Sequence, residues 1–598
     1  MPDGTSNTQN TAPDPWWDKP IFHSRPIKII SVGAGASGLL FAYKLQRSFD
    51  NFELILYEKN EEIGGTWLEN KYPGCACDIA AHAYTWSFEP NPSWSSTYAG
   101  SDEIQEYFLR FTEKYDLRKY CRFKKRISRA EWDNDKGQWS IEITDLESGN
   151  IIHDWCHFLI NANGVLNAWK WPDIPGIDKF EGPILHTAKY DRNLDLTGKT
   201  VALLGTGYAT TSQQILPLIP SPYSSSAIQT LPAILPKVKK VVSFNRSASW
   251  VFPTQGYAQR HYTDEEKQAF ASDPKKLEEH RRELDSNLNS LFSIFFQDHP
   301  AQKAITSAMR DAMAEKLKGS GLEDKVIPKW GVGCRRITPG VGYLDALVDE
   351  KTQVVPCGVK EITEKGCVSD DGEEYPVDVI ICATGFDTSY LPRFPIIGSN
   401  GESLADAWKD EPMNYLGFAA PGFPNYFIPV GPNSPVGNGP VLIGIEAQLD
   451  YILKLINRYQ TENIHSISPK MEAVEDFMEH KNNYMKRTVW EFDCRSWYKS
   501  GSTNGKVTAV WVGSTLHYLE TLRDPRYEDW NFTYIGNRFA FLGNGYSQTE
   551  LDRTADWSYY LRSEDDSPFL GRAKERRIYS RSGTISRPEI ESEYSVVL

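Results

Sequence analysis

The chain has 598 residues, of which 40% are hydrophobic and 24% are charged, and its formal net charge is −14. A chain of this length can bury a large core, and its length suggests three or four domains. The acidic balance argues against a nucleic-acid-binding protein, because such a protein needs a basic surface.

Nine cysteines are scattered along the sequence, which predicts reduced thiols in an intracellular compartment. Cys75 and Cys77 form an isolated CxC motif without a second pair at zinc spacing, so no metal site is expected. The N-terminus lacks the apolar run of a signal peptide, and the longest apolar stretch, 441–456, is too short and too charged to span a membrane. A cytoplasmic protein without membrane insertion is expected, as a monomer or a weak oligomer.

The first dinucleotide-binding pattern lies within residues 28–78. A strand-like apolar run at 29–32 leads into a GxGxxG turn and a helical pattern, and a second run at 54–57 ends at Glu58. Glu58 follows Gly38 by about 20 positions, the spacing at which an acid binds a ribose 2′-hydroxyl. The site should therefore hold a nucleotide without a 2′-phosphate.

Each residue type of this turn has a physical role. The first glycine allows the tight turn, the second lets the backbone approach a pyrophosphate, and the third lets the helix pack on the strand. The helix N-terminus then presents free N–H groups and a partial positive charge to the phosphates. The cofactor-binding residues expected here are Gly33, Gly35, Ala36, Ser37, Gly38, Glu58 and Lys59.

A second nucleotide unit begins with the strand-like run 200–204. Its turn contains Gly205, Thr206 and Gly207, but Thr210 replaces the third glycine, which weakens the match. Residues 221–236 are rich in Ser and Pro and predict an inserted loop. The next strand, 240–244, is followed by Arg246 and Ser247 instead of an acid. An arginine there pairs with a 2′-phosphate, so the site favours NADPH over NADH; the alternative is an ordinary surface arginine.

Two nucleotide folds in one chain, one of them for NADPH, imply electron transfer between cofactors, and FAD and NADPH are the natural pair. The fold predicted is α/β, with two interleaved doubly wound (Rossmann-like) nucleotide-binding domains and a helical insertion. In chain order, we expect an N-terminal arm (1–25), a first FAD-binding segment (26–170), a first NADP-binding segment (180–253), the helical insertion (254–329), a second NADP-binding segment (330–378), a second FAD-binding segment (379–562), and a polar tail (563–598) for which disorder or loose docking is expected.

Three further stretches lie at 64–78, 180–190 and 333–340, and their motifs resemble those of a known family, the Baeyer–Villiger monooxygenases, which are class B flavoprotein monooxygenases. Residues 64–78 fit their pattern of Gly-Gly, Trp, aromatic-Pro-Gly and Asp, and 333–340 resembles the segment that carries their active-site arginine. Residues 180–190 resemble their FxGxxxHxxxW fingerprint, with Tyr190 where Trp is usual. Weaker matches lie at 383–386, 431–434 and 496–498, and the likeness covers nearly the whole chain from about residue 16 to 545.

The resemblance implies a reaction. NADPH reduces FAD, O2 adds at flavin C4a, and the resulting peroxide attacks a ketone carbonyl, so that one oxygen atom is inserted to give an ester or lactone. The likeness is strongest to members that act on bulky or polycyclic ketones. The negative charge of the peroxide and of its adduct needs a fixed cation, and Arg336 is the catalytic residue expected to supply it, held by Asp78. The alternatives are a structural ion pair for Arg336 and a turn residue for Asp78.

The same resemblance implies further contacts to the cofactors. Trp67 would form a wall beside the flavin, Arg335 would contact an NADPH phosphate, and Trp497 would lie along the NADP ribose or pack in the core. His186 is expected to be a hydrogen-bonding strut or hinge and not a base. The cofactor-binding residues expected from the resemblance are Gly65, Thr66, Trp67, Asp78, Tyr84, Arg335, Thr384, Gly385 and Trp497.

Three alternatives remain open from the sequence. An N- or S-oxygenating flavin monooxygenase of the sister group shares the fingerprint, and Tyr190 does not separate the two groups. An NADPH oxidase or disulfide reductase is the second; a reductase would need a CxxC or CxxxxC motif beside the flavin, and Cys75–Cys77 has the wrong spacing. The third is a non-catalytic nucleotide-binding scaffold, which the intact first glycine motif disfavours.

Overall fold

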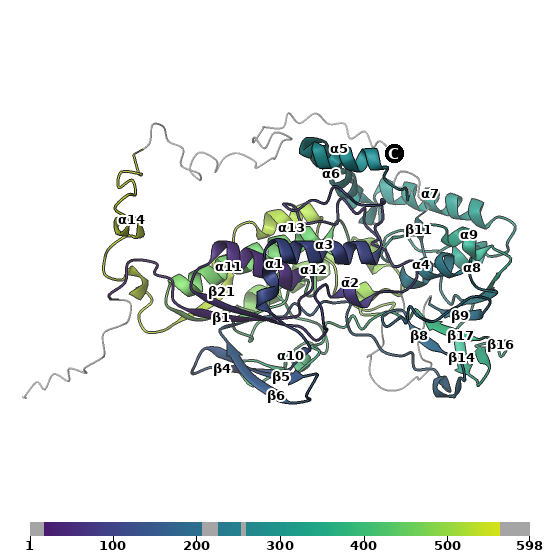
Figure 1. The fold of residues 1–598 in the computed structure, drawn as a ribbon, viewed down its shortest axis with the longest axis horizontal. Coiled ribbons are helices and arrows are strands. Elements are labelled where there is room, and N and C mark those ends of the chain that lie inside the picture. Colours follow the sequence, from purple (N-terminus) through teal and green to yellow (C-terminus); the bar gives the residue numbers. More distant parts are fainter. Residues whose placement is uncertain (1–16, 206–224, 253–258, 562–598) are drawn as a thin grey trace, which may run out of the picture. The chain divides into compact units, whose positions relative to one another are not determined.

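The computed structural model describes residues 17–205, 225–252 and 259–561 of the chain (Figure 1). It forms two compact units, one of residues 24–538 and one made of the two chain ends, of which 17–23 and 539–561 are described. In the unit of the chain ends, the rings of Phe22 and Phe541 stack at 5.2 Å, and the short helix α14 is Gln548–Leu551. The larger unit carries all the nucleotide-binding patterns that the structure describes.

The first nucleotide pattern forms a sheet of parallel strands in the order β19-β7-β1-β2-β3. Its strands are Tyr426–Phe427, Phe158–Ile160, Ile27–Val32, Phe52–Tyr57 and Cys121–Arg122 in that order. The sheet and its helices contribute to the largest buried apolar cluster among the described residues, because the apolar faces of these helices turn inwards. These helices are α1 (Ala36–Ser48), α3 (Ser101–Lys114) and α11 (Val441–Thr461).

The second pattern forms another parallel sheet, in the order β13-β10-β9-β17-β8. Its strands are Thr352–Val355, Lys240–Phe244, Thr200–Leu204, Val379–Cys382 and Ile184–His186 in that order. Strand β17 therefore belongs to the second sheet, and the expected return to the first domain at residue 379 is wrong. The chain rejoins the first sheet only at β19. An apolar run buried on both faces does not say which of two parallel sheets it enters.

Both faces of the second sheet are covered. Alternate residues of β9 point into different clusters: Val201 and Leu203 meet helices, whereas Ala202 and Leu204 meet a small antiparallel sheet (Figure 1). The helices are α4 (Ser225–Ile234), α7 (Pro300–Leu317) and α9 (Tyr343–Leu347), and the small sheet is β14 (Val359–Ile362), β15 (Gly366–Ser369) and β16 (Glu374–Pro376). The sheet thus has the two covered faces of a doubly wound fold.

Helix α4 corrects the prediction of an inserted loop at 221–236. Ser and Pro gave the segment a loop-like composition, but Ile228, Leu231 and Ile234 recur at helical spacing and are almost fully buried. Pro232 lies inside the helix, so tertiary packing outweighs the local preference of proline here. Residues 221–224 of the predicted loop lie outside the described residues.

The remaining elements flank the two sheets. Three of them form an antiparallel sheet: β4 (Lys125–Asp133), β5 (Gln138–Asp145) and β6 (Ile151–Cys156) pair in sequence order, and β18 (Ile396–Ile397) joins β4 in parallel. The expected helical insertion contains α5 (Asp264–Ser272), α6 (Pro274–Ser290), α7 and α8 (Glu323–Val326). Within the described residues, no helix is long and apolar enough to cross a membrane. The arm residues 1–16 and the tail 563–598 lie outside the described residues.

Cysteine chemistry differs from the prediction. Cys334 and Cys494, 160 positions apart, form a disulfide with their Cα atoms 6.5 Å apart, whereas the other seven cysteines are free thiols. The prediction of reduced thiols throughout is therefore wrong for this pair. Their sequence separation gave no signal, because connectivity cannot be deduced from spacing alone.

Candidate functional site

Two glycines of the turn in the first sheet, Gly33 and Gly38, cannot be replaced without strain. A Cβ atom on Gly38 would lie 2.2 Å from the Gly33 carbonyl oxygen, and Gly33 has a φ of +95°. A Cβ on Gly65, which has a φ of +53°, would lie 3.1 Å from the Cα of Gly35, so two glycine backbones meet here. Gly35 is the N-cap of α1 and gives that helix no side-chain cap. The first N–H groups of α1, which begins at Ala36 and Ser37, are thus available to a pyrophosphate.

Glu58 stands at the end of β2 and is 4% exposed. Its carboxylate accepts hydrogen bonds from the Ala34 N–H (2.9 Å) and the Asn60 N–H (2.8 Å). Burial raises the pKa of Glu58, and these two backbone donors oppose the rise. Each carboxylate oxygen has a second lone pair, so a ribose hydroxyl can still donate to it.

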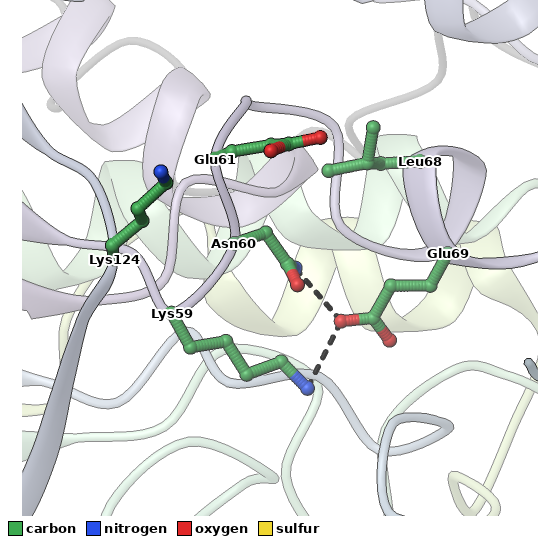
Figure 2. A pocket seen from close by; sticks show the side chains of 6 residues that line it. All are labelled: Lys59, Asn60, Glu61, Leu68, Glu69 and Lys124. Atoms are coloured by element: carbon green, nitrogen blue, oxygen red, sulfur yellow. Dashed lines mark hydrogen bonds and ion pairs between the residues drawn. The ribbon is translucent and has the colours of Figure 1, made fainter. Parts of the chain in front are cut away.

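A polar hollow of about 430 Å³ is lined in part by the residues that directly follow Glu58 in the sequence (Figure 2). Lys59 and Asn60 meet Glu69 in it, with Lys59 Nζ 2.9 Å from the carboxylate and the Asn60 amide donating over 2.8 Å. Its lining residues are Lys59, Asn60, Glu61, Leu68, Glu69 and Lys124. Its position beside Glu58 suits the ribose end of a nucleotide.

The segment between the glycine turn and Asp78 brings aromatic side chains together. Thr66 begins the short helix α2 (Thr66–Glu69), and Trp67 donates from Nε1 to the Tyr84 hydroxyl over 3.1 Å. The two rings meet edge to face at 5.6 Å. Burial raises the pKa of Tyr84, with a further rise from Cys77, so its hydroxyl stays protonated at any working pH.

Arg336 and Asp78 form a two-point ion pair. Arg336 Nε donates to Asp78 Oδ2, and Nη2 donates to Oδ1 over 2.8 Å; Nη1 donates to the Val436 carbonyl over 2.8 Å. The side chains are 28% and 19% exposed. Burial alone would lower the pKa of Arg336, but the charge and hydrogen bonds of Asp78 outweigh it and raise the pKa. The guanidinium is fixed in place and permanently charged.

The contacts with Asp78 and Val436 use three of the five guanidinium N–H groups of Arg336, and Arg336 also hydrogen-bonds to the Tyr498 hydroxyl, so one N–H group can face a further acceptor. Tyr498, which is 1% exposed, adjoins the ion pair, and burial raises the pKa of its hydroxyl to about 12. Its neighbour Trp497 packs on the Tyr498 ring at 4.6 Å. Neither Tyr498 nor the Val436 carbonyl was predicted to belong to the site; the match at 496–498 was the available signal for Tyr498.

In the second sheet, Gly205 directly follows strand β9. A Cβ on Gly205 would lie 2.3 Å from the Cβ of Ala227, so this glycine lets α4 pack on β9. Thr206, Gly207 and Thr210 lie outside the described residues. Arg246 and Ser247 follow the end of β10, and Arg335 lies near them, donating from Nη1 to the Ala248 carbonyl over 2.8 Å.

His186 ends strand β8 and is fully buried. Its Nε2 lies 3.1 Å from the Thr384 hydroxyl, its Nδ1 accepts from the Ala188 N–H over 3.1 Å, and its ring stacks on Trp169. Burial lowers the pKa of His186 to about 4. A neutral histidine bonded on both sides suits a strut. Thr384 and Gly385, the latter with a φ of +81°, follow β17 at the carboxyl end of the second sheet.

Two parallel sheets in one chain, the first with a glycine turn after strand β1 and the second with Gly205 after strand β9, are typical of α/β proteins that bind two dinucleotides. Residues 32–100 match the family described as NAD(P)-binding Rossmann-like domain. The chain is 38% identical over 558 residues to the FAD-binding monooxygenase moxY of Dothistroma septosporum, covering 92% of this chain and 85% of that protein.

Two further relatives agree. The Baeyer-Villiger monooxygenase of Streptomyces coelicolor is 32% identical over 501 residues, which cover 83% of this chain and 91% of that protein. The crystal structure of cyclohexanone monooxygenase from Rhodococcus sp. Phi1 bound to NADP+ is 25% identical with a TM-score of 0.72, and covers 86% of this chain and all of that chain. The chain belongs to the Baeyer–Villiger monooxygenases, the flavoprotein monooxygenase family that its motifs resemble, and the predicted fold class is confirmed.

Proposed function

We propose that the protein uses FAD and NADPH to insert one oxygen atom of O2 next to a ketone carbonyl, giving an ester or lactone. The first sheet would hold FAD through the uncapped N-terminus of α1 and through Glu58. The second sheet would hold NADPH through Gly205, Arg246, Ser247 and Arg335. Bound FAD, reduced by NADPH, would supply the activation of O2, as in the family chemistry.

One observation carries this proposal. Asp78 binds the Arg336 guanidinium at two points, and the guanidinium keeps an N–H group that can donate to a further acceptor. Asp78 comes from the segment that follows the FAD turn, and Arg336 comes from the segment that follows the helical insertion. A fixed cation at this meeting of the two nucleotide segments would stabilise negative charge as oxygen is delivered to a carbonyl carbon. Trp67 would limit water access on the flavin side.

The substrate class that we propose is a bulky or polycyclic ketone, on the likeness of the motifs to members that accept such ketones. The partners would be the ketone, O2 and NADPH, with the protein a monomer or weak oligomer in the cytoplasm. Size-exclusion chromatography with light scattering measures the oligomeric state, and imaging of a fluorescent fusion reports the location.

The experiment is oxidation of cyclic, aryl and polycyclic ketones by the FAD-loaded protein with NADPH under ¹⁸O2. We expect mass spectrometry to find esters or lactones that carry one ¹⁸O atom, formed in proportion to the NADPH consumed. The same assay contains an amine and a thioether.

The outcomes separate the alternatives. Label found on nitrogen or sulfur, with no loss of rate in Arg336→Ala, would assign the protein to the N- and S-oxygenating group instead. NADPH consumption that yields only hydrogen peroxide with every substrate would identify an oxidase.

A further inference from the structure

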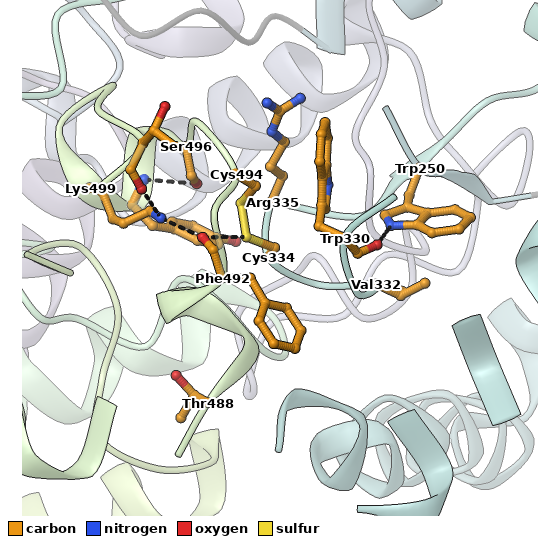
Figure 3. The surroundings of a disulfide bond; sticks show 12 residues. Trp250, Trp330, Val332, Cys334, Arg335, Thr488, Phe492, Cys494, Ser496 and Lys499 are labelled. Carbon is orange, nitrogen blue, oxygen red and sulfur yellow. Dashed lines mark hydrogen bonds between the residues drawn. A yellow bond between two sulfur atoms is a disulfide. The ribbon is translucent and has the colours of Figure 1, made fainter. Parts of the chain in front are cut away.

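The disulfide Cys334–Cys494 joins two segments of the candidate site. Cys334 stands two residues before Arg336, and Cys494 stands three residues before Trp497. Both cysteines are almost fully buried, and Cys334 Sγ lies 3.5 Å from the Phe492 carbonyl oxygen (Figure 3). The two segments therefore meet at a fixed point although 160 positions separate them.

Each cysteine is followed directly by an arginine. Arg335 is 7% exposed, its guanidinium carbon lies 4.3 Å from the centre of the Trp330 ring, and Figure 3 shows the two side by side near the disulfide. Arg495 is half-buried and donates from Nε to the Gly501 carbonyl over 2.6 Å. The disulfide thus brings two guanidinium-bearing residues to one place, and carbonyl groups help to position both.

These arginines act on one another electrostatically. Burial lowers the pKa of Arg335 to about 8, and the charge of Arg495 contributes to that lowering. Burial also lowers the pKa of Arg495, and the charge of Arg246 adds to that effect. By contrast, the charge that acts most strongly on Arg336 is the carboxylate of Asp78. Arg495 is thus within electrostatic reach of both Arg335 and Arg246, and such a gathering of positive charge favours the binding of an anion there.

The position of the three arginines in the fold indicates which anion would bind to them. Arg246 follows strand β10, where a 2′-phosphate is read in the dinucleotide fold. Arg335 contacts the same turn, because it donates a hydrogen bond to the carbonyl of Ala248, two residues after Arg246. Guanidinium groups offer forked donors that match phosphate oxygens. The anion that suits this position is the phosphate on the adenosine ribose of NADPH.

We infer that Arg495, tied to Arg335 by the Cys334–Cys494 disulfide, is a binding residue for the 2′-phosphate of NADPH. The inference rests on the proposed use of NADPH but not on the ketone chemistry. It adds to the site a residue from the segment 489–499, which lies far in sequence from the second nucleotide pattern. The disulfide acts as a positioning element, because it fixes the spacing of the two arginines.

The test is binding of 2′,5′-ADP to the FAD-loaded protein by isothermal titration calorimetry, with 5′-ADP as the probe that lacks the 2′-phosphate. We expect Arg495→Gln to weaken 2′,5′-ADP binding by about 10- to 100-fold without changing 5′-ADP binding. Arg495→Lys should recover some of the loss. Arg487→Gln, which changes an exposed arginine of the preceding segment, is the matched control and should bind as the wild type does.

Wild-type affinity of Arg495→Gln for 2′,5′-ADP would overturn the assignment of Arg495. The positioning role is tested in Cys334→Ser/Cys494→Ser, in which we expect weaker 2′,5′-ADP binding with retained FAD. If that variant loses FAD, the same titration is made on wild-type protein reduced with a phosphine, with the free thiols counted. Unchanged affinity after the disulfide is opened would overturn that role.

The result of the 2′,5′-ADP titration is independent of the result of the ketone assay. Specific loss of 2′,5′-ADP binding in Arg495→Gln, without esters from any ketone, would leave the binding residue in place and remove the proposed reaction. Failure of the wild type to bind 2′,5′-ADP would instead remove the NADPH assignment and the inference with it.

Discussion

Arg336 and Asp78 are 258 positions apart in the sequence, yet they form a two-point ion pair. The pair joins a segment that follows the first glycine turn to one that follows the helical insertion. Its formation requires the two segments to meet in the folded chain, so the Arg336 guanidinium is held in place only when the fold is complete.

Replacing Arg336 tests the catalytic role. We expect Arg336→Ala to lower kcat for ketone oxidation by about 10²–10³-fold, because a fixed donor to the developing negative charge is lost. NADPH should still be consumed, with hydrogen peroxide as the product. Arg129→Ala, which breaks an exposed ion pair with Glu131, serves as the control and should leave both rates unchanged. Full ester formation by Arg336→Ala would contradict the role.

A double-mutant cycle measures how far Asp78 and Arg336 act as a unit. Removing one partner leaves a partly buried charge without its counterion, and we expect Asp78→Ala to lower the free energy of unfolding by about 3 kcal/mol or less, since both side chains keep some solvent contact. The double variant Asp78→Ala/Arg336→Ala should lose less than the sum of the two single variants. Strict additivity in unfolding and in kcat would show that the residues act independently.

The disulfide predicts how many cysteines react with a thiol reagent before and after reduction. Denatured protein should react with a thiol reagent at seven cysteines before reduction and at nine after it. Chain-entropy arguments give about 5 kcal/mol for closing a loop of this length, so Cys334→Ser/Cys494→Ser should have a lower thermal midpoint than the wild type. Cys357→Ser, which removes a half-buried free thiol, is the control. Nine reactive thiols in the unreduced protein would refute the bond.

Much of this architecture could be predicted from the sequence, because the glycine turns and strand-like runs are local signals. The ion pair at the site was also predicted, but only through motif resemblance, since no spacing rule joins positions 78 and 336. Helix α4, the placement of β17 and the disulfide depend on tertiary packing. The buried face of α4 outweighs its Pro232, and β17 has the apolar run of any strand in a parallel sheet.

The glycine turn can be tested by adding single methyl groups. A Cβ on Gly38 would lie 2.2 Å from the Gly33 carbonyl oxygen, so Gly38→Ala should disturb the packing of α1 on β1 and lower stability. A Cβ on Gly35 would approach the Gly65 backbone no closer than 3.5 Å, which is an ordinary contact. Gly35→Ala should therefore fold but carry less FAD, because its methyl group would occupy space for the pyrophosphate. Flavin absorbance per protein and thermal midpoints distinguish the two effects; full flavin content in Gly35→Ala would place the cofactor elsewhere.

The buried histidines predict how stability depends on pH. His186 has its pKa lowered by burial from 6.5 to about 4, so between these values the unfolded chain binds more protons than the folded one. Stability is then fully present above pH 6.5 and falls as the pH drops towards 4, by about 3 kcal/mol for this residue. His82 and His157 shift in the same direction, with pKa values of about 3 and about 4.

The measurement is urea unfolding of the wild type and of His186→Gln from pH 7.5 to pH 5. We expect the stability of the wild type to fall over this range, and the variant, which lacks one of the histidines with a lowered pKa, to fall less steeply. The glutamine amide can still bond the Thr384 hydroxyl, so the variant should fold at pH 7.5. Equal slopes in the two proteins would mean that His186 takes up a proton as readily in the folded chain as in the unfolded chain, which would contradict its role as a buried neutral strut.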